Sequence, residues 1–494
     1  MGGDARTAAP ARALGWLRAH ELRTGGICVH SHHARAYAEV TGYVVHTLLD
    51  YGERELAIRL VQWLLSVQAP EGHFTDPDEE KLHVFDTGQV LRGLLASAAL
   101  VPAAGEAARR AADWLCAQMV DRGRGGFGPR YDGSIPESVH LYVLPPLCEA
   151  AELFQKRTYR TAAHRCLEHY LKHADGLRLR SLTHFLGYEL EALIDLGHGD
   201  LAMPVLEALH RVQAEDGSVR GAGDVPWVCT PGMAQLASCW YRTGRWEPAD
   251  RALAWLEAHQ RPSGGLLGSY GPKASYFPND ELSWAVKFYL DANLLRVRAF
   301  FERHADIFPS HVATDDGRTE AILAVVRPGD QVLEVGCGKG RFLRALRQSI
   351  PETECTGVDI SPALLRHLPR GVRGRRGALE AIPCPDDRFD VVFSVEAIEH
   401  SSNRAASVAE MTRVARPGGW VVIIDKQQSH WGRLTCPPWE TWPEALELSS
   451  LLSRGCDEVT SNPVGYDDRP AADGLMVVWR GRKRSKSQVS GIRG

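Results

Sequence analysis

The sequence predicts two domains of different class, an all-α domain followed by an α/β domain. Three observations predict this division: a helical phrase recurs six times before residue 260, a glycine-rich turn follows an apolar strand at 331–340, and strands alternate with helices from there on. Repeated helical hairpins must stack to bury their apolar faces, and alternating strands and helices are typical of a parallel sheet. At 494 residues the chain is also longer than one ordinary domain.

The all-α domain is predicted from the recurring phrase, which carries Trp at its fifth position in four copies. The copies begin at Arg12, Arg59, Arg110, Arg165, Pro204 and Arg251. A glycine turn, a common helix stop, follows each copy, and a second amphipathic stretch precedes the next. Six such hairpins predict an (α/α)6 toroid over residues 1–305. An open solenoid is the alternative, and the lack of a polar capping repeat favours closure. The Trp column keeps helical spacing within an apolar stripe, so core packing explains it better than sugar stacking.

The loops after the repeated helices should meet at one end of the toroid. They are rich in polar and aromatic residues: His30, His32, His33, His73, Asp76, Asp78, Arg130, Tyr131, Asp132, Tyr270, Tyr276, Asp280 and Glu281. Ordinary surface loops are polar as well, so a ligand-binding mouth and a plain surface are both open. We expect a mouth, with Tyr270 and Tyr276 as candidate catalytic residues, because their hydroxyls can serve in proton transfer.

Short segments of this domain resemble known toroids. Gln68, Gln213 and Gln260 each stand four residues before a glycine, which resembles the repeat of squalene cyclases and protein prenyltransferases. The segments 231–237 and 276–281 resemble glucuronyl C5-epimerases. Both resemblances imply the (α/α)6 fold and leave the chemistry open, since the aspartate-rich acid motif of the cyclases is not cleanly present.

The join falls in a short polar stretch with Pro and Gly, so we predict a linker at 306–317 and the α/β domain at 318–480. Residues 481–494 are basic and lack an apolar stripe, and we predict a disordered tail.

The α/β domain begins with an apolar strand that ends in Gly336, Gly338 and Gly340. Glycines are needed where backbone must approach a ligand closely. The next apolar strand ends in Asp359, 23 residues beyond Gly336, and a carboxylate at that spacing can accept both hydroxyls of a ribose.

Four segments in order resemble class I S-adenosylmethionine (SAM) methyltransferases. They are Leu333-Glu-Val-Gly-Cys-Gly-Lys-Gly340, Thr356-Gly-Val-Asp-Ile-Ser361, Phe389-Asp-Val-Val-Phe-Ser-Val-Glu-Ala-Ile-Glu-His400 and Val414-Ala-Arg-Pro-Gly-Gly-Trp-Val-Val-Ile424. The resemblance covers about the last third of the chain and implies a Rossmann-like domain with SAM as cofactor. The residues it implies for the cofactor are Glu334, Gly336, Cys337, Gly338, Gly340, Asp359, Ile360, Ala378, Leu379 and Val395. Ala378 stands where relatives often carry an Asp for the adenine amine, so backbone groups of Ala378 and Leu379 are expected to replace that contact.

The residues just past the fourth strand are the candidates for chemistry. An alcohol acceptor must lose a proton, and Glu396, Glu399 and His400 stand at the expected place, with His400 as the candidate base. Their pattern resembles ubiquinone-pathway O-methyltransferases, in which such residues can hold a divalent cation. Simple lining of the cleft is the alternative. The Trp- and Pro-rich segment 430–442 is expected to be an acceptor lid.

Composition narrows the remaining possibilities. The formal charge of −4 gives no case for nucleic acid, eleven scattered cysteines form no disulfide framework, and neither a signal peptide nor a transmembrane-length apolar run is evident.

The sequence therefore predicts a cytoplasmic, two-domain SAM-dependent methyltransferase that O-methylates a glycan or glycan precursor, with a toroid that recognises or processes the same small-molecule or glycan substrate. The alternative is a bifunctional enzyme whose toroid is an epimerase, lyase or cyclase acting on a polycyclic or isoprenoid product. Nothing in the sequence determines the oligomeric state.

Overall fold

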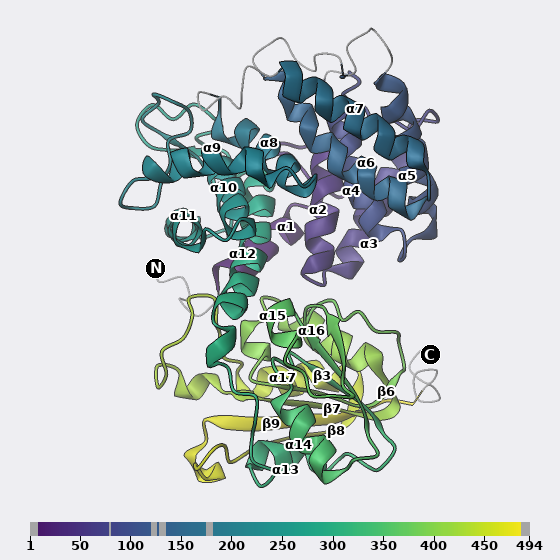
Figure 1. Ribbon diagram of the computed structural model, residues 1–494, viewed down its shortest axis with the longest axis vertical. Helices are drawn as coiled ribbons and strands as arrows, with labels where there is room; N and C mark the ends of the chain where they lie inside the picture. Colours follow the sequence, from purple (N-terminus) through teal and green to yellow (C-terminus); the bar gives the residue numbers. More distant parts are fainter. Residues whose placement is uncertain (1–7, 79–80, 120–125, 128–134, 174–180, 486–494) are drawn as a thin grey trace. The chain divides into compact units, whose positions relative to one another are not determined.

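The computed structural model describes residues 8–78, 81–119, 126–127, 135–173 and 181–485 (Figure 1). Chain contacts divide these residues into two compact units. Residues 9–49 and 53–296 form the helical unit, and the second unit is built mainly from residues 297 onward. The division falls inside a long helix, α12 (Ser283–Arg303), a little before the predicted boundary at residue 305. Among the described residues, no helix is both long and apolar enough to span a bilayer.

The helical unit alternates two kinds of helix. The odd-numbered helices are α1 (Ala9–Ala19), α3 (Arg54–Val67), α5 (Pro102–Gln118), α7 (Arg157–His173), α9 (Gly199–Arg211) and α11 (Trp246–His259). The even-numbered helices are α2 (Ala38–Asp50), α4 (Val84–Ser97), α6 (Leu144–Leu153), α8 (Thr183–Asp195), α10 (Thr230–Arg242) and α12. Every copy of the repeated phrase lies in an odd-numbered helix. These helices bury a single stripe, whereas α8 and α10 are buried on nearly every side, as expected of helices packed within a core.

Three glutamines connect successive odd-numbered helices through the same pair of hydrogen bonds. Gln68 Nε2 donates to the carbonyls of Gly72 (3.1 Å) and Ala107 (2.9 Å), so it joins the end of α3 to α5. Gln213 does the same between α9 and α11. Gln260 follows α11, but its second bond goes to the carbonyl of Ala9 at 2.9 Å. The last odd-numbered helix is therefore hydrogen-bonded to the first.

Replacing Gln260 with leucine is expected to loosen α1 selectively. The substitution removes three side-chain hydrogen bonds of about 1 kcal/mol each: two that the amide donates to the carbonyls of Ala9 and Gly264, and one that it accepts from Arg12. We expect amide hydrogen exchange in α1 to accelerate about 10- to 100-fold. Gln68→Leu is the matched control, because it removes the three equivalent bonds between α3 and α5 and should leave α1 unchanged. Equal exchange of α1 in the two variants would contradict this assignment.

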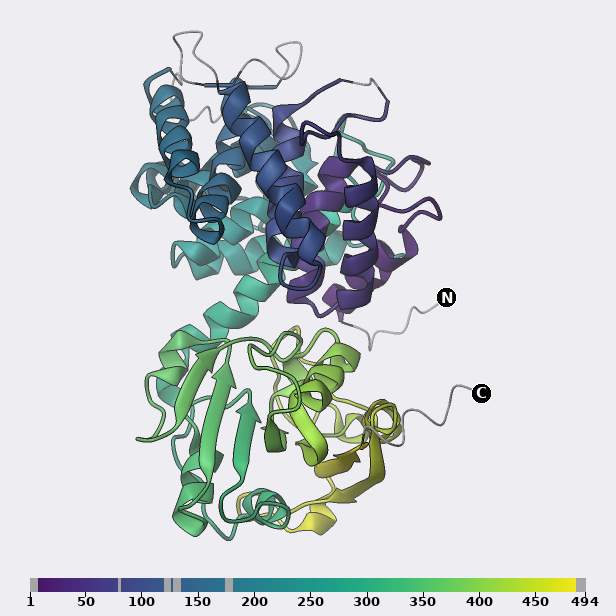
Figure 2. The same ribbon diagram turned by 90° about the vertical axis from the view of Figure 1, so that its right-hand side faces the viewer.

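The second unit contains a seven-stranded mixed sheet with the order β5-β4-β3-β6-β7-β9-β8. Its strands are β3 (Gln331–Val335), β4 (Glu354–Asp359), β5 (Arg373–Arg376), β6 (Phe389–Val395), β7 (Ala415–Lys426), β8 (Cys456–Pro463) and β9 (Met476–Lys483). The first five are parallel, and β9 pairs antiparallel with both β7 and β8. Figure 2 shows the parallel strands side by side as green arrows.

Helices of the second unit cover the sheet on both faces. They are α13 (Gly317–Leu323), α14 (Arg341–Ser349), α15 (Pro362–Leu365), α16 (Arg404–Val414) and α17 (Ala445–Ser453). Two apolar clusters result, one including Leu333, Val392 and Met411 and the other including Val332, Phe342 and Phe393. Because β3 leads to β4 on one side and β6 lies on the other, the strand order reverses at β3. A parallel sheet binds ligands at the carboxyl ends of its strands at this point.

The predicted tail is wrong at its beginning. Strand β9 extends through Lys483, and the Lys483 ammonium donates to Asp387 at 2.7 Å and to the carbonyl of Ala415 at 2.8 Å. Residues 481–483 are therefore part of the sheet, because pairing with β7 and β8 outweighs their polar composition. Residues 486–494 lie outside the described chain.

Candidate cofactor and acceptor site

The glycine turn after β3 has the backbone that the sequence predicts. Gly336, Gly338 and Gly340 have φ of 74°, 51° and 72°, a region that costs other residues energy. A Cβ on Gly336 would collide with Ala397 after β6, so this glycine is required for packing. A Cβ on Gly338 would have no neighbour within 4 Å. The backbone of Gly338 therefore faces open space at the carboxyl end of β3.

Asp359 holds this turn in place from the end of β4. Its Oδ2 accepts the amide hydrogen of Gly338 and its Oδ1 that of Ser361, both at 2.8 Å. Burial raises the pKa of the Asp359 carboxyl. Each carboxylate oxygen can accept a second hydrogen bond, so Asp359 retains acceptor capacity toward the open space beside Gly338.

Glu334 in β3 is a buried acid that lacks a full set of partners. It is 1% exposed, and its Oε2 has no hydrogen-bond partner among the described residues. Burial raises the pKa of the Glu334 carboxyl well above its usual range, and Arg341 opposes that rise. An orphaned buried carboxylate oxygen is costly unless a donor or cation meets it. Its chemistry fits the ammonium group of an amino-acid ligand.

The other residues predicted for the cofactor lie around the same strand ends. Cys337 and Val395 are buried, and Ile360 is half-buried after β4. Leu379 packs its side chain against the apolar cluster of the sheet, so only its backbone is available to a ligand. Ala378 forms an isolated bridge with Ala381, next to Gly377, whose amide donates to the carbonyl of Asp359.

Glu396 does not join Glu399 and His400, contrary to the predicted metal set. Its carboxylate pairs with Arg318 Nη1 at 2.9 Å and with Arg341, and these arginines lower the pKa of Glu396. The backbone of Glu396 has a φ of 50°, which turns the chain after β6. Two guanidinium groups already neutralise this carboxylate, so it is not free to bind a divalent cation.

His400 instead lies between Glu399 and Glu440. His400 Nε2 is 3.7 Å from Glu399 Oε1, and His400 Nδ1 is 3.9 Å from Glu440 Oε2. The ammonium of Lys426 contacts both oxygens of Glu399 and lies 3.9 Å from Glu440 Oε1. Although Glu399, His400 and Glu440 have metal-ligand spacing, a lysine cation stands between the two carboxylates. The residues therefore fit an internal ion-pair network better than the predicted divalent metal.

The His400 imidazole is neutral near pH 7. Burial lowers its pKa to about 4, and the carboxylate of Glu440 offsets only part of that effect. Its Nδ1 has no hydrogen-bond partner among the described residues. The ring of Phe301 packs edge to face against the imidazole, with ring centres 5.0 Å apart. A neutral imidazole with an unused nitrogen can accept a proton.

Glu440 is the site residue that sequence reasoning missed. It belongs to the segment 430–442, which we expected to be an acceptor lid. Within it, Trp439 and Trp442 are buried, and Trp442 Nε1 donates to Glu440 Oε1 at 2.8 Å. A lone acid between two tryptophans was the only available signal, because no fixed spacing relates Glu440 to His400.

The two tyrosines predicted at the toroid mouth have different surroundings. The Tyr270 hydroxyl donates to the carbonyl of His259 at 2.8 Å and accepts from the amide of Leu267, so it ties its own loop together and is not a catalytic candidate. Tyr276 lies 6.0 Å from the ring of His184, centre to centre, and burial raises its pKa well above its usual range. The predicted mouth residues Arg130, Tyr131 and Asp132 lie outside the described residues.

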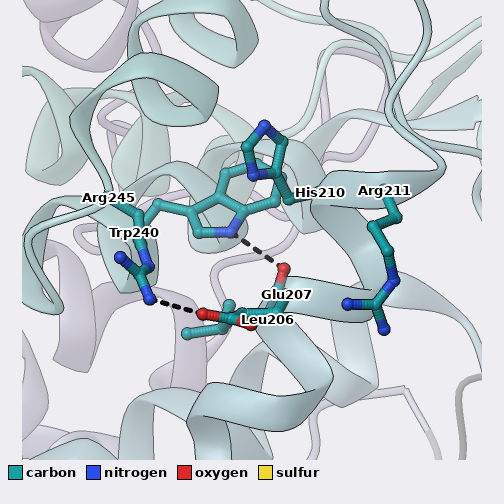
Figure 3. Close-up of a pocket in the computed structure, with 6 residues that line it drawn as sticks. All are labelled: Leu206, Glu207, His210, Arg211, Trp240 and Arg245. Atoms are coloured by element: carbon teal, nitrogen blue, oxygen red, sulfur yellow. Dashed lines mark hydrogen bonds and ion pairs between the residues drawn. The ribbon is translucent and has the colours of Figure 1, made fainter.

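A pocket of about 300 Å³ lies on the helical unit between α9 and the end of α10 (Figure 3). Leu206, Glu207, His210, Arg211, Trp240 and Arg245 line it. Arg245 pairs with Glu207, and Trp240 Nε1 donates to the carbonyl of Leu206 at 3.2 Å. His210 pairs with Glu247, outside the lining, at 3.2 Å. Most of the polar groups of the pocket therefore already have protein partners, and we assign it no ligand.

Comparison with known proteins identifies the class of the second unit. A family model described as "Methyltransferase domain" matches residues 333–423. The chain is 31% identical over 150 residues to phthiotriol/phenolphthiotriol dimycocerosates methyltransferase of Mycobacterium tuberculosis, which covers 29% of this chain and 54% of that protein. It is 35% identical over 160 residues to 2-methyl-6-phytyl-1,4-hydroquinone methyltransferase of Synechocystis, a match that covers 31% of this chain and 49% of that protein. It is 31% identical over 136 residues to malonyl-[acyl-carrier protein] O-methyltransferase of Serratia marcescens, which covers 26% of this chain and 52% of that protein.

Solved structures are similar over the same part of the chain. A SAM-dependent methyltransferase from Thermotoga maritima has 21% identity and a TM-score of 0.28, covering 34% of this chain and 88% of its own. A phosphoethanolamine N-methyltransferase of Haemonchus contortus, in complex with SAM, has 15% identity and a TM-score of 0.29. That match covers 34% of this chain and 52% of its own. The matched part of this chain is a Rossmann-like methyltransferase domain. The cofactor of this domain is SAM, and the chain spans about half the length of the curated relatives it matches.

Proposed function

We propose that the protein transfers the methyl group of SAM to a hydroxyl oxygen of an apolar small molecule, with His400 as the proton acceptor. The observation that carries this proposal is the buried, neutral His400, whose Nδ1 has no partner. His400 follows β6, which pairs with β3, and a Cβ on Gly336 of the glycine turn would strike Ala397. The imidazole thus belongs to the same strand ends as the cofactor turn.

The chain supplies a distinct group for each part of the cofactor. The orphaned oxygen of Glu334 suits the ammonium, Asp359 has acceptor capacity for the ribose, and the open space at Gly338 lets backbone approach. Bound SAM supplies a methyl group already activated on a sulfonium sulfur. The residues of the domain then need only to hold the acceptor in line with that methyl group.

His400 is the group that accepts the proton of the acceptor hydroxyl. As the new carbon–oxygen bond forms and the carbon–sulfur bond breaks, the acceptor O–H bond breaks and its proton passes to His400 Nδ1. Glu440 and Glu399, at 3.9 and 3.7 Å, stabilise the resulting imidazolium. Lys426 is paired with Glu399 and so limits the net negative charge around the ring.

The surroundings of His400 support an acceptor with an apolar or ring-shaped body. Phe301 contacts the imidazole, and Trp439 contacts Phe300 with ring centres 5.2 Å apart. Such aromatic surfaces favour apolar ligands. A matched relative is named for a phytyl hydroquinone and another for O-methylation, which points the same way. The glycan acceptor rests on the short epimerase-like segments of the sequence alone.

We further propose that the helical unit is a closed (α/α)6 toroid that binds the same acceptor. The bond from Gln260 to Ala9 supports closure, as does the bond from Thr47 in α2 to Asp291 in α12 at 2.7 Å. Both amide atoms of the buried Gln89 and one oxygen of Glu191 have no hydrogen-bond partner among the described residues. Buried polar groups of this kind are normally satisfied, and a ligand's hydroxyls would satisfy them. Catalysis of a second reaction by the helical unit is the alternative.

Incubating the full chain with SAM and a panel of acceptors tests this function. We expect hydroquinones and hydroxylated isoprenoids to gain about 14 Da on oxygen, the mass of a transferred methyl group replacing hydrogen, while free sugars do not react. Gln89→Leu should raise the KM of the preferred acceptor and leave kcat nearly unchanged, if the helical unit only binds it. Methylation of glycans alone would reject the apolar acceptor, and an unchanged KM would remove the helical unit from substrate binding.

A further inference from the structure

Two loops of the helical unit, 28–37 and 267–282, are joined by backbone bonds although they are far apart in the chain. His30 and Leu282 form an isolated bridge. The amide of Ser31 donates to the carbonyl of Glu281 at 3.0 Å, and the amide of Glu281 donates back to Ser31 Oγ at 3.2 Å. These bonds place the histidines of the first loop beside the acid that precedes Glu281.

His30, His32 and Asp280 meet at this junction. The Nδ1 atom of His32 is 2.8 Å from Asp280 Oδ1, and the Nδ1 atom of His30 is 3.3 Å from the same oxygen. All three side-chain atoms lie within 4.8 Å of one another. We propose that His30, His32 and Asp280 bind a divalent transition-metal ion of the zinc type. This site is separate from the SAM site and does not depend on the methyl transfer proposed above.

The arrangement around His30 favours a cation over a hydrogen bond. The backbone amide of His32 donates to His30 Nδ1 at 3.3 Å, so this nitrogen is an unprotonated acceptor. It has one lone pair, and a metal ion bound there would replace this long hydrogen bond. The atom that faces it is a carboxylate oxygen, Asp280 Oδ1, which presents lone pairs as well. Two facing acceptors repel each other unless a cation lies between them.

The distances suit a tetrahedral ion. Zinc–nitrogen and zinc–oxygen bonds of about 2.0–2.2 Å place neighbouring ligand atoms of a tetrahedron roughly 3.3 Å apart. The separation of His30 from Asp280 equals that value, and the separation of His32 from Asp280 is shorter by half an ångström. Two imidazoles and one carboxylate are a ligand set that zinc and related ions accept.

The three ligands leave an open coordination position, as in metal sites that bind a substrate or water. The neighbouring histidine, His33, is not available to fill it, because its Nε2 is 3.2 Å from Asp78 Oδ2. Asp78 is itself held by the Tyr37 hydroxyl at 2.6 Å. An oxygen donor from a ligand, such as a carboxylate or hydroxyl, is the chemistry that the open position would take.

Metal titration of the full-length protein tests the site. After treatment with a chelator and its removal, Zn²⁺ is titrated by calorimetry, and Co²⁺ is added in parallel as a spectroscopic probe. We expect one equivalent of metal and a cobalt spectrum without the thiolate charge-transfer band. That absence would separate this site from binding to the protein's free cysteines. Stoichiometric binding with a thiolate band would overturn the proposal.

Variants locate the bound ion. His32→Ala and Asp280→Asn should each weaken Zn²⁺ binding at least about 10-fold, and His32 is 72% exposed, so its loss should not disturb folding. His164→Ala, an exposed histidine of α7, is the matched control and should bind as the wild type does. His400→Gln should also bind normally. Loss of binding in His400→Gln with full binding in His32→Ala would move the ion to the Glu399–His400–Glu440 cluster and overturn the proposal.

Discussion

Replacing Gly338 with aspartate is expected to lower the affinity for SAM at least about 100-fold, or about 2.7 kcal/mol. Gly338 has a φ of 51° and faces open space. A side chain there fills the volume into which the cofactor must fit. The new carboxylate would also stand near Asp359, whose Oδ2 binds the Gly338 amide, and near the buried Glu334. Calorimetric titration of the full chain with SAM measures the change.

Gly329→Asp is the matched control for this experiment. Gly329 has a φ of 85°, and a Cβ there would have no neighbour within 4 Å. It lies in the turn before β3, so the substitution introduces a comparable backbone cost and the same charge at the other end of the strand. We expect its SAM affinity to match the wild type. Equal affinity in the wild type and both variants would exclude the glycine turn as the cofactor site.

His400→Gln is expected to lower kcat about 100- to 10,000-fold while SAM affinity stays unchanged, because general-base catalysis contributes an effect of that size. Glutamine retains a polar side chain of similar length but cannot take up the acceptor proton. In the wild type the neutral ring is the active form, so kcat/KM should fall as the pH falls through the His400 pKa of about 4. The variant should lack this acid limb.

A fall in kcat/KM at low pH that comes from protonation of His400 must be distinguished from one that comes from unfolding of the protein. The pKa of His400 is about 4 in the folded state and 6.5 ordinarily, so the unfolded chain binds a proton more readily. The contribution of His400 to the free energy of unfolding therefore falls as the pH falls from 6.5 toward 4. Circular dichroism at each pH monitors this loss. His367→Gln, an exposed histidine of the same unit, is the control. A kcat equal to that of the wild type in His400→Gln would reject the proposal that His400 is the general base.

Much of the local structure of the candidate cofactor site could be predicted because its signals are local in sequence. The turn after β3 needs positive φ at Gly336, Gly338 and Gly340, and only glycine adopts this region freely. Asp359 could be predicted by its position at the end of the next strand. The same holds for the repeated phrase, since helical periodicity and a following glycine specify a helix and its end.

The chemistry of Glu396 and His400 depended on contacts that no local pattern encodes. Glu396 was predicted to act with His400 from its spacing, but Arg318 and Arg341 bind its carboxylate. Glu440 approaches His400 from a segment 40 residues away, and Lys426 enters between Glu440 and Glu399. Which of these charges neutralise one another depends on which distant segments the fold brings together beside the sheet.

The sequence by itself determined the order of the elements, the glycine turn and the class of the second unit, because a short stretch of chain suffices to specify a helix, a strand or a tight turn. The tertiary structure alone decided which side chains act together. Asp280 meets His32 across 248 residues, and Gln260 meets Ala9 across 251. Such pairs form when stacked helices bring distant loops together to bury their apolar faces, and that packing is a property of the whole chain.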